Sequence, residues 1–404
     1  MTLHPPVPGP SASGIAPAFP SEEYDARVRA IRAAMDDAGL GALLLASPEN
    51  IYYLVGLDHL GYFAFTLLVL PLEGPPMLVI RAMERPTVEL QTPQSLLVPY
   101  GDDEHPADAV TGALRALGPI PGRVGVERST MYLPVDVWER IAAALPGLGW
   151  SDASQLVART SAIKSPREIA MVRRAAALSD RALQKGVAAA GEGVPEREIA
   201  AAIYAELIAG GSDSPGFPPL VRSTPSLALE HVTWSDRPLA HGDTLFLELS
   251  ASVARYHAPL SRLAHVGDAP AGLDRVADHA LNGLDAVRRA LRPGATAGEV
   301  YEAWQRTVDA ALGHARYRRH HCGYMTGIGF PPTWSGSGTP VGLRAGDELV
   351  LSEGMVFHVF SWIFGQGPAD YGVSDTALVT ADGCELLTAT TREPMLVSPG
   401  IDWR

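Results

Sequence analysis

Residues 244–266 read TLFLELSASVARYHAPLSRLAHV, two apolar runs separated by a short polar segment. The runs 244–251 and 263–266 are typical of strands, so the stretch predicts a hairpin. The first run contains Glu248, and a carboxylate in an apolar strand needs partners and has a raised pKa. His257 follows nine residues later, and the two side chains can face each other across a hairpin. The same spacing also fits a surface hairpin with solvated ends.

Strands and helices are expected on both sides of this hairpin. Residues 165–168 read SPRE and form a helix start, with Ser165 as the N-cap and Glu168 at the capping-box position. This pattern predicts a long helix that ends near residue 189. The other expected helices are 196–209, 272–291 and 297–312, and the other expected strands are 348–351, 355–360 and 376–379.

The first part of the chain has the pattern of a smaller α/β domain. Expected helices at 23–40, 107–117 and 135–145 alternate with apolar runs at 42–45, 66–72, 77–80 and 123–126. Residues 47–50 read SPEN, which is turn chemistry. Proline and small residues dominate 1–20, which predicts a flexible leader. We therefore expect a leader at 1–20, an N-terminal domain at 21–157 and a second domain at 158–404.

Composition excludes several classes of function. The chain has 404 residues, 47% of them hydrophobic and 19% charged, as in a globular protein. It carries 32 basic and 45 acidic side chains, a formal charge of −13, so nucleic acid and membrane surfaces are poor partners. The two cysteines cannot form a disulfide framework and fit a reducing compartment. No targeting or membrane segment is recognisable, and we expect a cytoplasmic protein.

Histidines supply further candidates for chemistry. His231 follows a loop rich in proline and serine and precedes Trp234, which suits either a general acid–base or an ordinary loop histidine. His358 lies inside an apolar run, where a buried structural histidine is an equally good interpretation. His320, His321 and Cys322 suggest a metal site, but no further ligand is adjacent. The sequence has no G-x-S-x-G motif, so a serine nucleophile is disfavoured.

Two segments resemble creatinase and prolidase. Residues 47–54, SPENIYYL, are similar to a segment of the N-terminal domain of that family, and residues 164–169, KSPREI, resemble the start of its catalytic domain. The likeness covers nearly everything after residue 20. It implies an α/β protein with a small N-terminal α/β domain, followed by a pita-bread domain with a curved, mainly antiparallel sheet and flanking helices.

The resemblance also implies which residues of this chain stand at the metal-ligand positions of the family. Metallopeptidases of this fold hold two metal ions with two Asp, one His and two Glu. Proline and phenylalanine cannot ligate such cations, and one carboxylate cannot hold two. We therefore expect no metal and no cofactor. In this chain the five metal-ligand positions of the family correspond to Glu248, Pro259, Tyr324, Phe360 and Ser374.

Within the family, two metal-free branches are similar to this chain. The catalytic histidine of creatinase aligns with His231, but Ser261 stands where creatinase has an acidic residue that binds its guanidinium substrate. The ectoine-hydrolase-like branch matches better. Its motifs resemble Glu248 followed by the RYHA of 255–258 and Arg262, the segment 323–334, and Phe357-His358.

The resemblance implies a metal-independent hydrolase of a C–N bond in a small amidine- or guanidine-like amino-acid derivative, with ring opening of ectoine to N-acetyl-diaminobutyrate as the expected reaction. The alternatives are a binding protein without catalysis and an Xaa-Pro peptidase with unusual metal ligands. A small zwitterionic substrate and a homodimer are implied as partners. The expected catalytic residues are His231, Glu248, His257 and His358; the expected substrate-binding residues are Tyr324, Trp334, Arg262, Trp362 and Asp375.

Overall fold

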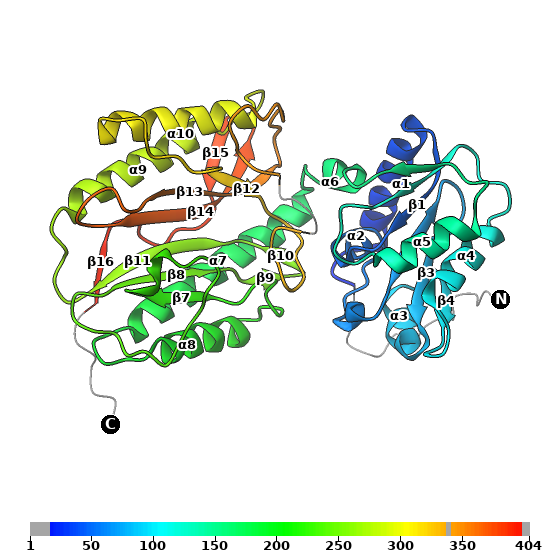
Figure 1. Cartoon of the computed structure of the whole chain (residues 1–404), viewed down its shortest axis with the longest axis horizontal. Helices are drawn as coiled ribbons and strands as arrows, with labels where there is room; N and C mark the ends of the chain where they lie inside the picture. Colours follow the sequence, from blue (N-terminus) through cyan, green and yellow to red (C-terminus); the bar gives the residue numbers. More distant parts are fainter. Residues whose placement is uncertain (1–16, 337–340, 398–404) are drawn as a thin grey trace. The chain divides into compact units, whose positions relative to one another are not determined.

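The computed structural model describes residues 17–336 and 341–397, which form two compact units that meet in the sequence between Ser161 and Ala162 (Figure 1). The boundary expected after residue 157 falls inside helix α6 (Leu156–Thr160). Most of the expected leader, residues 1–16, lies outside the described residues. Phe19 nevertheless belongs to the folded unit, since it is only 4% exposed and the Arg27 guanidinium lies 4.4 Å from its ring centroid.

A six-stranded sheet forms the centre of the first unit, in the order β4-β3-β2-β1-β5-β6. Its strands are short apolar runs, and all six residues of β1 are buried. The strands are β1 (Leu40–Leu45), β2 (Leu67–Pro71), β3 (Met77–Arg81), β4 (Leu96–Tyr100), β5 (Arg123–Val126) and β6 (Trp150–Asp152). The helices besides α6 are α1 (Ser21–Asp37), α2 (Pro48–Val55), α3 (Arg85–Gln91), α4 (Pro106–Ala116) and α5 (Val135–Ala144). The prediction of a small α/β domain is confirmed.

The turn expected at 47–50 is instead the beginning of α2. Serine followed by proline favours a turn and a helix start for the same reason, because both begin with an extended residue and a fixed proline φ. Here Ser47 is the N-cap residue, but its hydroxyl and backbone N–H bond the buried Glu127 carboxylate rather than the helix.

An eight-stranded sheet forms the second unit, with six strands in the order β12-β13-β14-β11-β8-β7, β15 beside β14 and β16 beside β11. The expected strand at 348–351 is absent, and only Val350 makes an isolated bridge, to Thr296. The strands are β7 (Leu220–Ser223), β8 (Thr244–Leu249), β11 (Leu260–Val266), β12 (Gly323–Met325), β13 (Val356–Ile363), β14 (Tyr371–Thr380), β15 (Gly383–Leu386) and β16 (Met395–Val397).

Two helix pairs cover one face of this sheet: α7 (Pro166–Ala189) with α8 (Glu196–Ala209), and α9 (Leu273–Ala290) with α10 (Ala297–Leu312) (Figure 1). The capping box predicted at Ser165 and Glu168 begins α7. Leu247 lies toward α7, and Ser361 accepts a hydrogen bond from Trp304 of α10. We call the helix-covered face the outer face and the opposite one the inner face. The curved, mainly antiparallel sheet with flanking helices confirms the expected pita-bread fold.

The hairpin at 244–266 has an extension that changes its register. A small ribbon, β9 (Ser252–Val253) and β10 (Tyr256–His257), is inserted between β8 and β11. Glu248 therefore lies opposite Ser261, whereas His257 lies opposite Ser252. The expectation that Glu248 and His257 face each other is wrong, because the insertion moves His257 into the ribbon.

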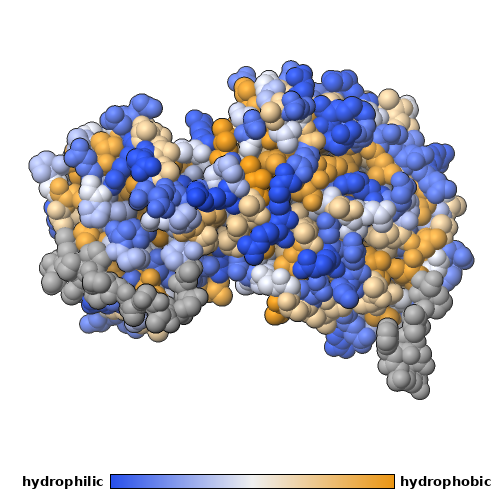
Figure 2. Space-filling view, turned by 180° about the vertical axis from the view of Figure 1, so that it is seen from behind, coloured by the Kyte–Doolittle hydropathy of each residue, from blue (hydrophilic) through white to orange (hydrophobic). Residues whose placement is uncertain are grey.

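On the face that Figure 2 shows, hydrophilic residues are spread over both units, with apolar areas between them. Among the residues that the structure describes, no helix is both long enough and apolar enough to cross a bilayer.

Candidate active site

Glu248 lies on the inner face near the middle of the second unit's sheet. Side chains alternate between the two faces of a strand, so residues directly opposite one another share a face. Glu248 of β8 is opposite Ser261 of β11, which is opposite Ser374 of β14. Ser374 is in turn opposite Phe360 of β13. Four neighbouring strands thus present one carboxylate, two hydroxyls and an aromatic ring in a row.

His358 connects this row to two aromatic side chains. Its Nε2 lies 2.7 Å from the Ser374 hydroxyl and 3.9 Å from a carboxylate oxygen of Glu248, and its Nδ1 lies 2.9 Å from the Tyr324 hydroxyl. Ser374 donates to Ser261 and therefore accepts from His358, so Nε2 carries the proton and Nδ1 accepts from Tyr324. Trp334 donates its indole N–H to Tyr324 at 2.8 Å. The network fixes the tautomer of a neutral imidazole.

Burial sets the ionisation of these groups. Desolvation raises the pKa of Glu248 to about 8, against the opposing effect of Arg222, while Glu230 adds to the rise. Burial lowers the pKa of His358 to about 3. The carboxyl is therefore largely protonated and the imidazole neutral at pH 7. A general acid–base works best when its pKa is near the working pH, and Glu248 meets that condition.

His257 is placed away from this network, in a structural setting. It is fully buried, its Nε2 accepts from the backbone N–H of Gly216 at 2.8 Å, and its Nδ1 bonds the Arg255 carbonyl at 2.9 Å. Burial lowers its pKa to about 4, so it stays neutral. With both ring nitrogens occupied, His257 has no free atom for a substrate, contrary to the catalytic contact that we expected.

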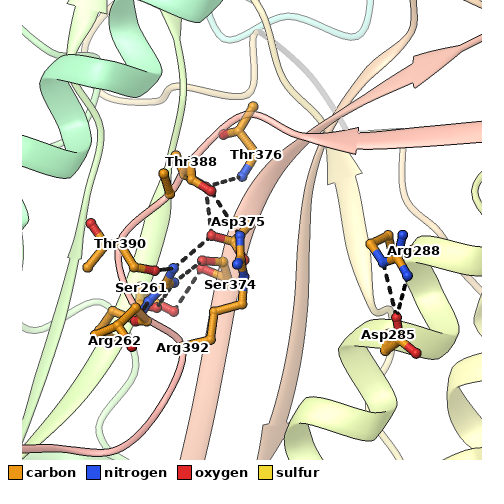
Figure 3. Close-up of polar contacts among 12 residues, drawn as sticks. Ser261, Arg262, Asp285, Arg288, Ser374, Asp375, Thr376, Thr388, Thr390 and Arg392 are labelled. Atoms are coloured by element: carbon orange, nitrogen blue, oxygen red, sulfur yellow. Dashed lines mark hydrogen bonds and ion pairs between the residues drawn. The ribbon is translucent and has the colours of Figure 1, made fainter.

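Arg262 and Asp375 lie on the outer face, because Arg262 is opposite Leu247 and Asp375 is opposite Val359 (Figure 3). Both are fully buried, and their side chains pair at 2.8 Å. The Arg262 guanidinium also donates to four backbone carbonyls, those of Ser261, Ser374, Thr390 and Thr391. This setting leaves no donor for a ligand and corrects the substrate-binding role expected for the pair.

The other expected residues differ in how close they lie to the network of His358 and Tyr324. His231 is exposed, with a φ of 57°, and its ring centroid is 6.1 Å from that of Phe217. Phe217 in turn packs on Trp334, at 5.3 Å, so His231 is two ring contacts from the Tyr324 network. Trp362 follows Phe360 on the inner face, with ring centroids 5.0 Å apart. Trp334, Tyr324 and Trp362 are thus close to the network, and His231 is at its edge.

Two arginines near Glu248 were not expected from the sequence. Arg222 of β7 is 1% exposed and lies over the Phe246 ring, 4.5 Å from its centroid. Arg319 precedes β12 and lies over the Trp362 ring at 4.8 Å. Both guanidiniums lower the pKa of Glu248. The sequence signal that could have revealed Arg222 is its position as a charged residue inside the short apolar run of β7.

The donor atoms at the five positions carried over from the family do not fit a two-metal site. They provide one carboxylate, a phenol and a hydroxyl, together with a proline and a phenylalanine that cannot ligate. Among residues 17–336 and 341–397, no group of three or more His, Cys, Asp or Glu side chains is arranged to hold an ion. His320 and His321 adjoin each other, with ring centroids 4.0 Å apart, but no carboxylate in the part of the chain that the structure describes completes a site around them.

The fold and the inner-face network define a two-domain hydrolase of the pita-bread class. Residues 170–381 match the model of metallopeptidase family M24, and residues 27–162 match the creatinase/prolidase N-terminal domain. The chain belongs to the M24 family, as its resemblance to creatinase and prolidase implied.

Individual relatives cover almost the whole chain. An ectoine hydrolase of Halomonas elongata is 30% identical over 399 residues, 93% of this chain and 97% of the relative. An uncharacterized hydrolase/peptidase of Sinorhizobium fredii is also 30% identical, over 392 residues and the same shares. Among solved structures, the dipeptidase PepE of Mycobacterium ulcerans superposes with a TM-score of 0.80 at 26% identity, covering 94% of this chain and 99% of its own. The similarity to an ectoine hydrolase supports the branch inferred from the sequence.

Proposed function

We propose that this protein is a metal-independent hydrolase that opens a C–N bond in a small amidine-type zwitterion, with ectoine as the model substrate. The observation that carries the proposal is the replacement of a two-metal donor set by a single carboxylate of raised pKa, Glu248, beside a neutral histidine. The ectoine hydrolase relative supports the same chemistry. An amidinium carbon is electrophilic without a Lewis acid, so this reaction needs a base and a proton donor rather than a metal.

Glu248 alone can supply both functions. As a carboxylate it takes a proton from a water whose oxygen bonds to the amidinium carbon, and the C=N π electrons move to nitrogen. The protonated Glu248 then delivers that proton to the ring nitrogen as the C–N bond breaks, and the proton of the remaining hydroxyl passes through Glu248 to the released amine. One water is added, one amide and one ammonium form, and the total charge is unchanged. Direct attack by the ionised Glu248 oxygen would form an imidoyl ester as the ring C–N bond breaks, with the departing nitrogen taking its proton from water. Hydrolysis of that ester by the resulting hydroxide would give the same amide and restore the Glu248 carboxylate.

The neighbouring side chains position this carboxyl and the ring. Neutral His358 holds the Tyr324 and Ser374 hydroxyls in one arrangement, which orders the polar row around Glu248. Tyr324 and Trp334 offer aromatic surface to an amidinium, and a cation over tryptophan gains about 0.5–2 kcal/mol. The Trp362 ring already carries the Arg319 guanidinium, 4.8 Å from its centroid. We propose that His231 acts only at the edge of the site and that His257 is a positioning residue, which holds the loop at Gly216.

We expect the chelator-treated protein to convert ectoine to N-acetyl-diaminobutyrate, with no loss of rate relative to untreated protein. Mass spectrometry of the product and metal analysis of the same sample make the measurement. Activity that disappears with the chelator and returns with Mn²⁺, Co²⁺ or Zn²⁺ contradicts the proposal and favours an Xaa-Pro peptidase. Tight binding of ectoine without product favours a non-catalytic binding protein.

The pH dependence follows from the raised pKa of Glu248. The active form is the carboxylate, and its fraction in the free protein increases as pH rises through about 8. We therefore expect kcat/KM for ectoine to rise about tenfold per pH unit below that value and to level off above it. A kcat/KM that falls above pH 8 would show instead that the neutral carboxyl is the active form. The Glu248→Asp variant, whose carboxylate is shorter, tests whether the inflection belongs to this residue.

A further inference from the structure

Two guanidinium groups share one aromatic surface on the inner face. The surface consists of Phe246, Phe360 and Trp362, and we call it the aromatic floor. The centroid of the Trp362 ring is 5.5 Å from that of Phe246 and 5.0 Å from that of Phe360. Arg222 lies over the Phe246 end of the floor and Arg319 over the Trp362 end. The two cations therefore flank a surface that continues along β8 to Glu248, two residues after Phe246.

The charges around the aromatic floor do not balance. Arg222 has a counter-charge in the half-exposed Glu230, 3.5 Å away, and donates to the Leu229 carbonyl. Arg319 makes no ion pair and no side-chain hydrogen bond with any part of the chain that the structure describes. Its Nε is buried without a partner. Glu248 does not compensate it at pH 7, because burial keeps that carboxyl largely protonated. One positive charge is left over beside the reacting group.

Other donors at the same place are also unused. The indole N–H of Trp362 and the Nε of Arg222 are buried, and neither has a partner among the described residues. A buried donor without a partner costs roughly 1–3 kcal/mol, so such groups are rare, and several together point to a missing ligand. Each of these three unused groups is an N–H donor, and one belongs to an uncompensated cation. The matching ligand is an anion.

We propose that Arg319 binds the carboxylate of the substrate over the aromatic floor, with Arg222 as the second positive group, and that this selects amidines that carry a carboxylate. A guanidinium fork pairs with a carboxylate through two parallel hydrogen bonds, whereas an ammonium cannot. The inference rests on the proposed function for the reaction at Glu248, and it replaces Arg262 as the carboxylate-binding arginine. The zwitterion is then held at both ends, its amidinium near Glu248 and its carboxylate at Arg319.

The test compares two rings that differ only in the carboxylate: ectoine and 2-methyl-1,4,5,6-tetrahydropyrimidine. Dissociation constants are measured by calorimetry for the wild type, Arg319→Met and Arg319→Lys. Methionine keeps an apolar chain over Trp362, and lysine keeps the charge without the fork. Arg316→Met is the matched control, because Arg316 is exposed and lies in the same segment.

We expect the wild type and Arg316→Met to prefer ectoine by about 10- to 100-fold, the usual effect of a hydrogen bond to a charged group. Arg319→Met should lower this preference to about threefold or less, Arg319→Lys should fall between the two, and the carboxylate-free ring should bind all four proteins equally. Equal weakening of both rings by Arg319→Met, or a wild type without preference, overturns the inference.

The turnover assay distinguishes the proposed hydrolase function from the proposed role of Arg319. Ring opening at equal kcat/KM for both rings supports the proposed function and rejects the role of Arg319. Binding of ectoine that depends on Arg319, with no product formed, supports the carboxylate site and rejects the proposed hydrolase.

Discussion

The Glu248→Gln variant should lose ectoine hydrolysis by roughly 100- to 10,000-fold in kcat, the range that general acid–base groups contribute. Glutamine has the same shape and can neither accept a proton from water nor attack the amidinium carbon. The affinity for ectoine should change much less, because the substrate carboxylate still meets Arg319 over the aromatic floor. Single-turnover kinetics and calorimetry on the same preparation measure the two effects. The control is Glu353→Gln, which changes an exposed glutamate in the same unit and should leave kcat unaltered.

The free energy of unfolding of Glu248→Gln distinguishes a loss of chemistry from a loss of fold. The pKa of Glu248 is raised from 4.5 to about 8 in the folded protein, so the unfolded chain ionises first as pH rises. Glu248 therefore lowers the free energy of unfolding progressively between about pH 4.5 and pH 8, by an amount of the order of a few kcal/mol, and the loss is complete above that window. Glu248→Gln should be more stable than the wild type, with a gain that grows over this pH range. An inactive variant that is less stable at pH 8 contradicts this account.

Most elements that carry the site could be predicted, because each has a strong local signal. The capping box at Ser165, the strand around Glu248 and the polar position His358 inside an apolar run all came from residue pattern, and the family resemblance pointed to Tyr324 and Ser374. Glu248 and His358, which the structure brings together, are both single polar residues inside apolar strands. Burial of a polar side chain in such a strand costs free energy unless the side chain is hydrogen-bonded or paired, which limits the roles that the residue can have.

Which face of the sheet a residue occupies could not be predicted. Register sets the face, and the register here depends on the β9–β10 ribbon, whose length no local pattern specifies. A shift by one residue moves a side chain to the opposite face. The role expected for Arg262 came from the family resemblance, which did not specify the face on which its side chain lies. Arg319 was missed for another reason. It lies in a segment without periodicity, and only the aromatic floor beneath it gives it a function. The expected homodimer stays a prediction, which sedimentation can test.

The second large effect is expected at the buried pair of Arg262 and Asp375, where the Asp375→Asn substitution should lower the free energy of unfolding by about 3–5 kcal/mol. Both side chains are 0% exposed, so removal of one charge leaves Arg262 buried beside only carbonyls and the second partner of Asp375, Arg392 (Figure 3). Asp285→Asn is the control, because it breaks only solvent-exposed pairs in the same unit, with Arg288 and Arg289, for each of which about 0–1 kcal/mol is expected. Urea denaturation gives both values. Arg262 also donates to the Ser374 carbonyl, so the loss of stability should come with a modest decrease in kcat and an unchanged preference for the carboxylate. An unaltered stability together with a raised KM for ectoine would show instead that Arg262 and Asp375 bind the substrate. The reason for assigning the substrate carboxylate to Arg319 would then be lost.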